Sequence, residues 1–136
     1  MSIQVKGIQN VLKNLSKKAS DINKATDRGV VATASEIQRE AILSISSRPS
    51  MGESYKRGSK THVASKPGDA PNTDTGTLVK SIAISHIKGS KIAYVFTDLD
   101  YGAYLELVMD RPWLYPAMIA KQDELQPNIR AELAKI

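Results

Sequence analysis

Apolar residues recur every three or four positions over the first third of the chain, a spacing typical of amphipathic helices. The first run ends at Ile22, and a second continues to Ile45. The two runs comprise Ile8, Val11, Leu12, Leu15, Ala19 and Ile22, then Val30, Ala34, Ile37, Ala41 and Ile45. Ser20 and Asp21 are good helix N-caps, so we expect a turn there and a long second helix to about Ser46. Both apolar stripes are expected to face the core.

Two further segments alternate between apolar and polar positions, as half-buried strands do. Residues 2–6 predict a short N-terminal strand that Gly7 ends. Residues 82–97 predict a β-hairpin with its turn at residues 88–91. The hairpin carries apolar residues on both faces, so we expect one face to meet the helices and the other to meet a neighbouring molecule.

The C-terminal part of the chain predicts two more helices. Residues 101–109 form a short helix, and the last helix begins near Pro116, a suitable residue for a first turn. Pro127 is expected to kink or restart that helix. Between the two helices, Arg111 and Pro112 precede Trp113, the only tryptophan. Trp113 is interpreted as a core anchor for the last helix, or alternatively as an interface hot spot.

Residues 47–73 form a long segment rich in Ser, Gly, Lys and Pro, for which we expect a loop. Structureless loops of this length are uncommon inside compact domains, so it should be disordered or ordered by a partner. The predicted fold is α+β in a single domain, 1–136. A small antiparallel sheet, made of the hairpin 82–97 and the N-terminal strand, packs against the long N-terminal helix and a C-terminal helix, with the loop 47–73 outside.

Composition adds limits to this picture. With 41% hydrophobic and only 5% aromatic residues, the core should be modest and further stability should come from assembly of copies. There is no cysteine, no apolar run long enough to cross a bilayer and no signal-peptide pattern at the N-terminus. We therefore expect a soluble protein that stays where it is made, without contact with a membrane.

The chain is basic, with a net charge of +5, which suits nucleic acid, acidic lipid, an acidic protein partner or simply a solvated surface. Several of the basic residues lie in the loop 47–73, and we interpret them as an interface loop. They are Arg48, Lys56, Arg57, Lys60 and Lys66.

No combination of residues predicts catalysis, a cofactor or a metal site. His62 and His86 lack a nearby acid and nucleophile at a diagnostic spacing. Asp98 and Asp100 lack a surrounding calcium loop and are interpreted as strand-end residues. Asp-Thr-Gly at 74–76 has the letters of an aspartic protease, but no second copy exists. Gly-Ser-Lys-Thr at 58–61 lacks the upstream glycine of a phosphate loop.

The segment from Ser65 to Ile82 is the most distinctive of the chain. Its two prolines force the residues before them into extended geometry, and Gly76 permits a close or left-handed turn. Asp74 and Thr75 can cap backbone N–H groups at that turn. A polar loop therefore changes here into an ordered core element that begins near Leu78.

This segment resembles the head–tail joining family of tailed bacteriophages, also called neck, tail-completion or minor tail-component proteins. The family pattern Pro-Gly-x-Ala-Pro, Asp-Thr-Gly-x-Leu and Ser-Ile is matched by Pro67, Gly68, Ala70, Pro71, Asp74, Thr75, Gly76, Leu78, Ser81 and Ile82. A second family pattern consists of Tyr-x-x-x-x-Glu, a short turn and then Arg-Pro-aromatic-Leu-x-Pro-Ala. It is matched by Tyr101, Glu106, Arg111, Pro112, Trp113, Leu114, Pro116 and Ala117. We refer to these as the first and second motif blocks.

The resemblance implies a structural virion protein of the neck or tail, assembled in the host cytoplasm. It implies a homo-oligomeric ring, with a hexamer favoured, that joins or completes the tail at the head–tail interface. The implied partners are the connector or head-closure protein and the tail terminator or tail tube, with possible contact to DNA in the axial channel. The alternative from the charge alone is a basic nucleic-acid-binding protein. No residues are left to support an enzyme.

Overall fold

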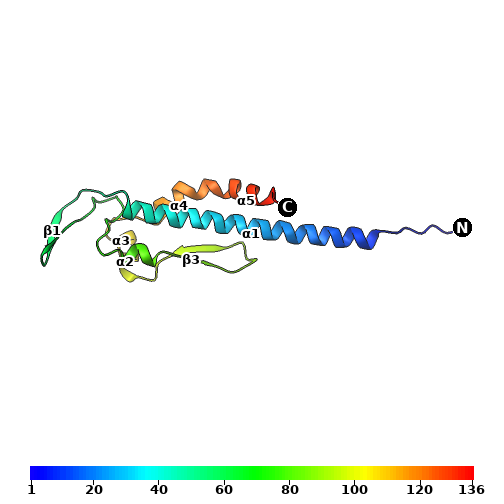
Figure 1. Ribbon diagram of the computed structural model, residues 1–136, viewed down its shortest axis with the longest axis horizontal. Coiled ribbons are helices and arrows are strands. Elements are labelled where there is room, and N and C mark those ends of the chain that lie inside the picture. Colours follow the sequence, from blue (N-terminus) through cyan, green and yellow to red (C-terminus); the bar gives the residue numbers. More distant parts are fainter.

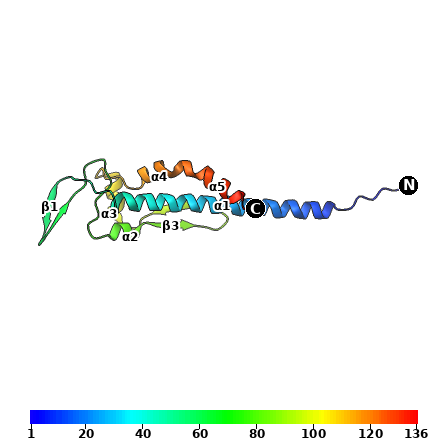
Figure 2. The same ribbon diagram turned by 45° about the horizontal axis from the view of Figure 1, so that its top comes forward.

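The computed structural model describes residues 1–136 apart from the side chain of Arg57. One helix, α1 (Ile8–Ser46), runs through most of the length of the molecule. Figures 1 and 2 show a hairpin of β3 (Ala83–His86) and β4 (Ala93–Phe96) along one side of α1, and α4 (Tyr115–Lys121) and α5 (Leu125–Leu133) along another. The α+β class is confirmed, but the strands form two separate two-stranded sheets and not one three-stranded sheet.

The turn predicted near Ser20 and Asp21 is wrong, because α1 continues through both residues. A capping residue stabilises a helix end but does not create one, and no proline interrupts residues 8–46. Two steps of four residues, from Ile22 through Thr26 to Val30, also continue the apolar face without a shift. With 39 residues, α1 is roughly 58 Å long.

The N-terminal part of α1 projects beyond the rest of the molecule (Figure 1). Its apolar stripe, expected in the core, is exposed instead: Ile8, Val11 and Leu12 are each 56% exposed and Leu15 is 62% exposed. We call residues 8–22 the helical arm. The strand predicted over residues 2–6 is also wrong, since the segment has no regular structure and a strand needs a partner to satisfy its backbone.

The hairpin predicted over residues 82–97 is confirmed, with β3 and β4 antiparallel. The register pairs Ile84 with Val95 and Ser85 with Tyr94. Partners in such pairs point to the same face, and neighbours along a strand point to opposite faces. Ile84 and Val95 therefore lie on the inner face toward α1, and Val95 packs against the core.

The segment 47–73 is not a structureless loop. It contains a second antiparallel hairpin, β1 (Ser54–Arg57) and β2 (Lys60–Val63). Backbone bonds between Gly52 and Ala64 and between Ala64 and Glu53 extend the ladder toward the body. This hairpin projects from the end of the molecule opposite to the N-terminus (Figure 1), and we call residues 52–64 the β arm.

The core lies where the short elements cross the C-terminal half of α1. These elements are α2 (Thr77–Ser81) and α3 (Asp100–Leu107), the latter close to the predicted helix 101–109. The buried cluster consists of Ala41, Ile45, Leu78, Ile82, Trp113 and Ala117. The predicted restart of the last helix is confirmed, because a 3-10 turn, η1 (Gln122–Glu124), separates α4 from α5. Within the described residues, no helix combines the length and the apolar character needed to cross a membrane.

Candidate assembly surfaces

The two motif blocks meet around Trp113. This side chain is 1% exposed, packs in the same cluster as Leu78 and Ile82, and donates from its Nε1 to the carbonyl oxygen of Gly102 at 3.0 Å. Trp113 therefore anchors the core of a single subunit and is not available to a partner. Gly102 has to be glycine at this contact, because a Cβ would lie 2.9 Å from a methyl group of Leu78.

Glu106 explains the spacing of the second block. Its Oε2 accepts hydrogen bonds from the backbone N–H groups of Trp113 at 2.6 Å and Leu114 at 2.9 Å, and its Oε1 accepts from Tyr115 at 2.9 Å. The first N–H groups of a helix have no partner within it, and negative charge is favoured there. Glu106 thus supplies from α3 the anionic cap for the start of α4, where Pro116 occupies the first turn.

The first block forms turns that join the second block. The N–H of Gly68 donates to the carbonyl oxygen of Asp110 at 2.8 Å. Gly76 is the N-cap of α2 in the left-handed conformation, with φ of 80°, which agrees with the turn expected there. Asp74, expected to cap this turn, has its carboxylate 3.7 Å from Nδ1 of His62. Ser81 lies at the end of α2, and its hydroxyl is 2.6 Å from that of Thr97.

A cleft of about 580 Å³ lies at the base of the β arm, between the two motif blocks. Residues of both blocks line it, together with part of the predicted interface loop. They include Arg48, Ser50, Lys66, Gly68, Pro112 and Pro116. The cleft shows that residues far apart in the sequence, which carry the resemblance, form one surface beside the arm.

The predicted interface loop is divided between two places. Lys56 and Lys60 lie on the β arm, and the side chain of Arg57 lies outside the described residues. Arg48 pairs with Glu40 on α1, and this guanidinium lowers the pKa of the Glu40 carboxyl. Arg48 therefore fixes the exit of α1.

The side chain of Asn72 joins both ends of the β arm to the body, a role that no sequence pattern predicted. Its side-chain nitrogen donates to the carbonyl oxygens of Ser50 at 2.5 Å and Val63 at 2.9 Å. Its oxygen accepts from the N–H of Ser50 at 2.8 Å. One amide side chain thus satisfies three backbone groups, two of Ser50 before the β arm and one of Val63 near the end of it.

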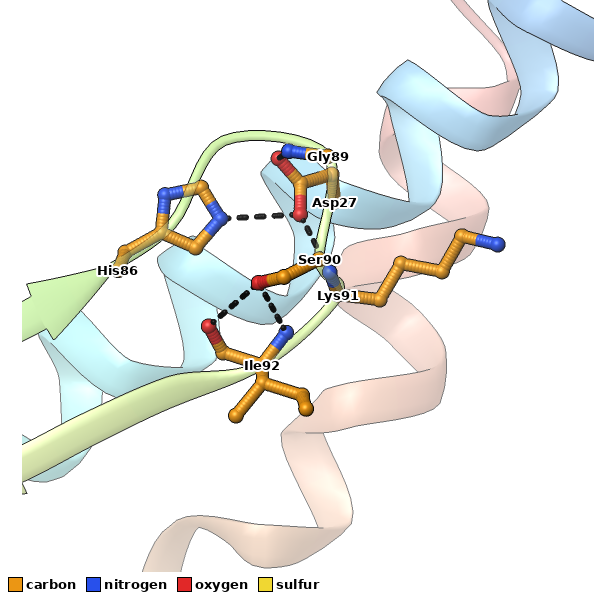
Figure 3. A network of polar contacts seen from close by, with 6 residues as sticks. All are labelled: Asp27, His86, Gly89, Ser90, Lys91 and Ile92. Carbon is orange, nitrogen blue, oxygen red and sulfur yellow. Dashed lines mark hydrogen bonds and ion pairs between the residues drawn. The ribbon is translucent and has the colours of Figure 1, made fainter.

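Asp27 holds the turn of the β3–β4 hairpin against α1 (Figure 3). Its carboxylate accepts hydrogen bonds from the N–H groups of Gly89 at 2.9 Å and Lys91 at 2.8 Å, and lies 2.9 Å from Nε2 of His86. The Gly89 bond, followed by the His86 contact, lowers the pKa of Asp27 to about 2. The predicted strand position of His86 is confirmed, but its partner Asp27 is 59 residues away and was not predicted.

The outer face of the β3–β4 hairpin is apolar and exposed. Tyr94 and Phe96 point away from α1, and Tyr94 is 62% exposed. Ile87 and Ile92, just beyond the strands, are exposed as well, and so are Tyr101 and Tyr104 of α3. Because the sheet has two strands, each also has one edge without a strand partner within the described residues. We call Ile87, Ile92, Tyr94 and Phe96 the aromatic face.

The described residues contain no group of three or more His, Cys, Asp or Glu side chains placed to hold a metal ion. Comparison of the chain with protein-family models, with curated proteins and with solved structures gave no match. The arrangement of surfaces and of the motif residues is therefore the basis for a functional conclusion.

Proposed function

We propose that this protein is a structural subunit of the neck or tail of a tailed bacteriophage, which assembles into a ring at the head–tail interface. The sequence resemblance provides the viral context, and a hexamer is the favoured ring. The residues that carry the resemblance have structural roles in one subunit. Glu106 caps α4, Trp113 anchors the core and Gly76 turns the chain into α2.

The exposed area of the isolated subunit carries the proposal. A compact monomer of 14.8 kDa exposes about 7,000 Å². This chain exposes 9692 Å², an excess of roughly 2,700 Å² over the compact expectation. A standard interface buries about 800 Å² on each partner, so a subunit with two neighbours in a ring buries about 1,600 Å². The excess is large enough to supply both interfaces.

The kind of surface also fits assembly. Monomeric proteins rarely expose large contiguous apolar patches, and such patches mark interaction sites. The aromatic face lies beside unpartnered strand edges, which can accept a strand from a neighbour. Different patches on the two sides of one subunit give a head-to-tail interface, and such an interface closes into a ring when its rotation divides a full turn.

The β arm is suited to contact an adjacent subunit or the next ring along the axis. It projects from the body, carries Lys56 and Lys60, and ends away from the core (Figure 2). The expected partners are the connector or head-closure ring on one side and the tail terminator or tail tube on the other. A basic arm would suit an acidic surface on either partner.

Electron microscopy of the purified protein, alone and with tail tubes, tests this function. Rings that attach to tube ends are expected for the wild type. The double substitution Tyr94→Ser with Phe96→Ser should abolish ring formation without unfolding the subunit, because both side chains are exposed. The matched control is Tyr115→Ser, which changes one exposed tyrosine outside the aromatic face. Monomeric particles that never attach to tube ends would contradict the proposal.

A basic nucleic-acid-binding protein is the second candidate, and the helical arm gives a specific reason for it. Lys13 and Lys17 of the arm, with Lys24 just beyond it, repeat at helical spacing on the face opposite to the apolar stripe. A basic stripe of this kind can follow a phosphate backbone. Binding to duplex DNA should then weaken with salt, with a slope of about −0.9 in log–log form per phosphate contacted. A binding curve that does not change with salt would exclude this candidate.

A further inference from the structure

The helical arm has an apolar stripe that nothing in its own subunit covers. Ile8, Val11, Leu12, Leu15 and Ile22 are all exposed, and the arm extends past every other element (Figures 1 and 2). An isolated helix of this length is only marginally stable in water without packing on its apolar face. We therefore expect another surface to cover the stripe in the assembled protein.

An apolar groove of about 280 Å³ lies farther along the same helix. Its floor is formed by Val30, Thr33, Ala34 and Ile37 of α1. One wall belongs to β4, and the other belongs to α4 and the start of α5. The wall residues are Ala93, Val95, Leu114, Met118 and Leu125. Met118 and Leu125 are exposed at the edge of this groove.

The stripe and the groove match in position and in length. Two steps of four residues lead from Ile22 through Thr26 to Val30, so both features lie on one face of α1. The central part of the stripe, Leu12 to Ala19, and the groove floor, Val30 to Ile37, each span two helical turns of roughly 10 Å. An arm can therefore lie along the floor with its stripe facing it.

The charges of the two features are complementary. The helical arm carries Lys13, Lys17 and Lys18 against Asp21, although Lys13 and Lys17 lie on the face opposite to the stripe. Lys18 borders the stripe on the helix surface. At the groove, Asp123 and Glu124 of η1 are exposed and directly precede Leu125, which lines the wall. Opposite charges at the rim favour the correct pairing and speed the encounter.

The arm cannot enter the groove of its own subunit. Both belong to one uninterrupted helix, and a continuous helix does not fold back on itself. A coiled coil of two arms is also a poor solution, since residues 8–22 provide about two heptads and sustained pairing takes three or four. The arm therefore needs an apolar surface outside its own subunit, and the groove of another molecule offers one of matching length.

We propose that the helical arm of one subunit occupies the apolar groove of a second copy of this chain. The contact uses different surfaces on the two molecules, so it can repeat from subunit to subunit. This contact would be one interface of the proposed ring. Only the closure of the ring rests on the proposed function, because pairing of arm and groove does not require a phage partner.

Cysteine cross-linking gives a direct test, because the natural chain has no cysteine. Leu15→Cys places one thiol on the arm of one protein, and Leu125→Cys places one on the groove wall of another. We expect the mixed pair, under mild oxidation, to form a disulfide-linked heterodimer at least tenfold faster than the control pair. That control is Asn14→Cys with Leu125→Cys, which moves the thiol off the stripe. Equal rates, or no heterodimer, would overturn the proposal.

Solution mass provides the second measurement. Leu12→Glu with Leu15→Glu should reduce the assembly to the 14.8 kDa monomer, while Asn10→Glu with Asn14→Glu adds the same charge behind the stripe and should leave assembly unchanged. An unchanged circular dichroism spectrum of the variant shows that its folding is intact. Assembly that survives the stripe variant would overturn the proposal, as would a monomeric wild type that binds phosphatidylserine vesicles through the arm.

These results are distinct from a failure of the proposed function. Specific cross-links without attachment to tail tubes would support the arm-in-groove contact and count against the neck role. If the stripe variant still formed rings that attach to tail tubes, the neck role would be supported and the arm-in-groove contact contradicted, because assembly would then use other surfaces.

Discussion

Asp27 shows how much a single side chain contributes where two distant segments meet. Its carboxylate accepts two backbone hydrogen bonds from the hairpin turn and faces His86 (Figure 3). The side chain is nearly buried, so an unpartnered carboxylate there would be costly. The three contacts remove that cost and fix the hairpin against α1.

The pH dependence of stability should report this contact. Hydrogen bonding lowers the pKa of Asp27 from 3.8 to about 2 in the folded protein. Between these values the unfolded chain binds more protons than the folded one, so stability rises with pH. The contribution is complete above pH 4 to 5 and is lost as the pH falls toward 2. Thermal unfolding from pH 2 to 7 measures it.

Asp27→Asn is the variant for this prediction. It should lower the melting temperature by several degrees at pH 6, and the difference from wild type should shrink toward pH 2. Asp123→Asn serves as the control, because it removes one carboxylate from an exposed site of the 3-10 turn. A constant difference at all pH values for Asp27→Asn would contradict the assignment.

At Gly102, packing decides whether an alanine raises or lowers the stability of the protein. Replacing a helical glycine by alanine ordinarily gains about 1 kcal/mol of stability. At this position the new Cβ would lie 2.8 Å from a methyl carbon of Thr97 and 2.9 Å from one of Leu78. Overpacking of that kind costs about 1–3 kcal/mol, so Gly102→Ala should destabilise. Urea unfolding measures the change.

The neighbouring exposed residue provides the comparison. Ala103→Gly should cost about 1 kcal/mol from helix propensity alone, with no change in packing. If Gly102→Ala proved more stable than the wild type, the close approach of α3 to Leu78 and Thr97 would be wrong.

Among the elements, the junction of α3 and α4 depends on Glu106. Glu106→Ala removes the acceptor for the N–H groups of Trp113, Leu114 and Tyr115. Hydrogen bonds to a charged group contribute about 1.5–3 kcal/mol, so a loss of about 2–3 kcal/mol is expected in chemical denaturation. Glu106→Gln keeps one carbonyl acceptor and should lose less. Equal stability of all three proteins would show that α4 needs no cap from α3.

The elements with strong local patterns could be predicted from the sequence. The hairpin around residues 88–91 and the restart of the last helix near Pro127 followed from alternation and from proline geometry. Glycine at position 76 indicated a close or left-handed turn, and a left-handed one starts α2. In each case the determining interaction lies within a few residues along the chain.

The remaining elements depend on contacts that no local pattern contains. Residues 2–6 alternate like a strand but find no strand to pair with. The β arm was missed because its strands are polar, although Gly58 and Ser59 between Tyr55 and Val63 match a two-residue hairpin turn. The stripe of residues 8–22 looks like a core stripe, and only the packed structure shows that no core reaches it.

The candidate surfaces were predicted in part. Apolar residues on both faces of the hairpin indicated that one face would be left over, and Tyr94 and Phe96 now define that face. The clamp made by Asp27 and the amide bonds of Asn72 join residues far apart in the chain. Such long-range pairs leave no mark in a single sequence.

Over the whole molecule, order should be graded along its length. The core around Trp113 and Ile45 is buried, whereas the helical arm and the β arm make few contacts with it. Amide hydrogen exchange of the free subunit should therefore be fast in residues 8–22 and 54–63 and slow in the C-terminal half of α1. Protection of residues 8–22 should rise on assembly. Slow exchange of the arm in a dilute monomer would contradict this gradient.

The amide of Asn72 has a mechanical consequence for the β arm. Because Asn72 bonds to Ser50 before the hairpin and to Val63 within it, these bonds hold the two segments at its base in a fixed register. A force on the tip of the β arm should then rotate the whole arm as one rigid unit about its base, beside the cleft that Lys66 and Pro112 line. Binding of the tip by another molecule would therefore turn the base of the arm against the cleft.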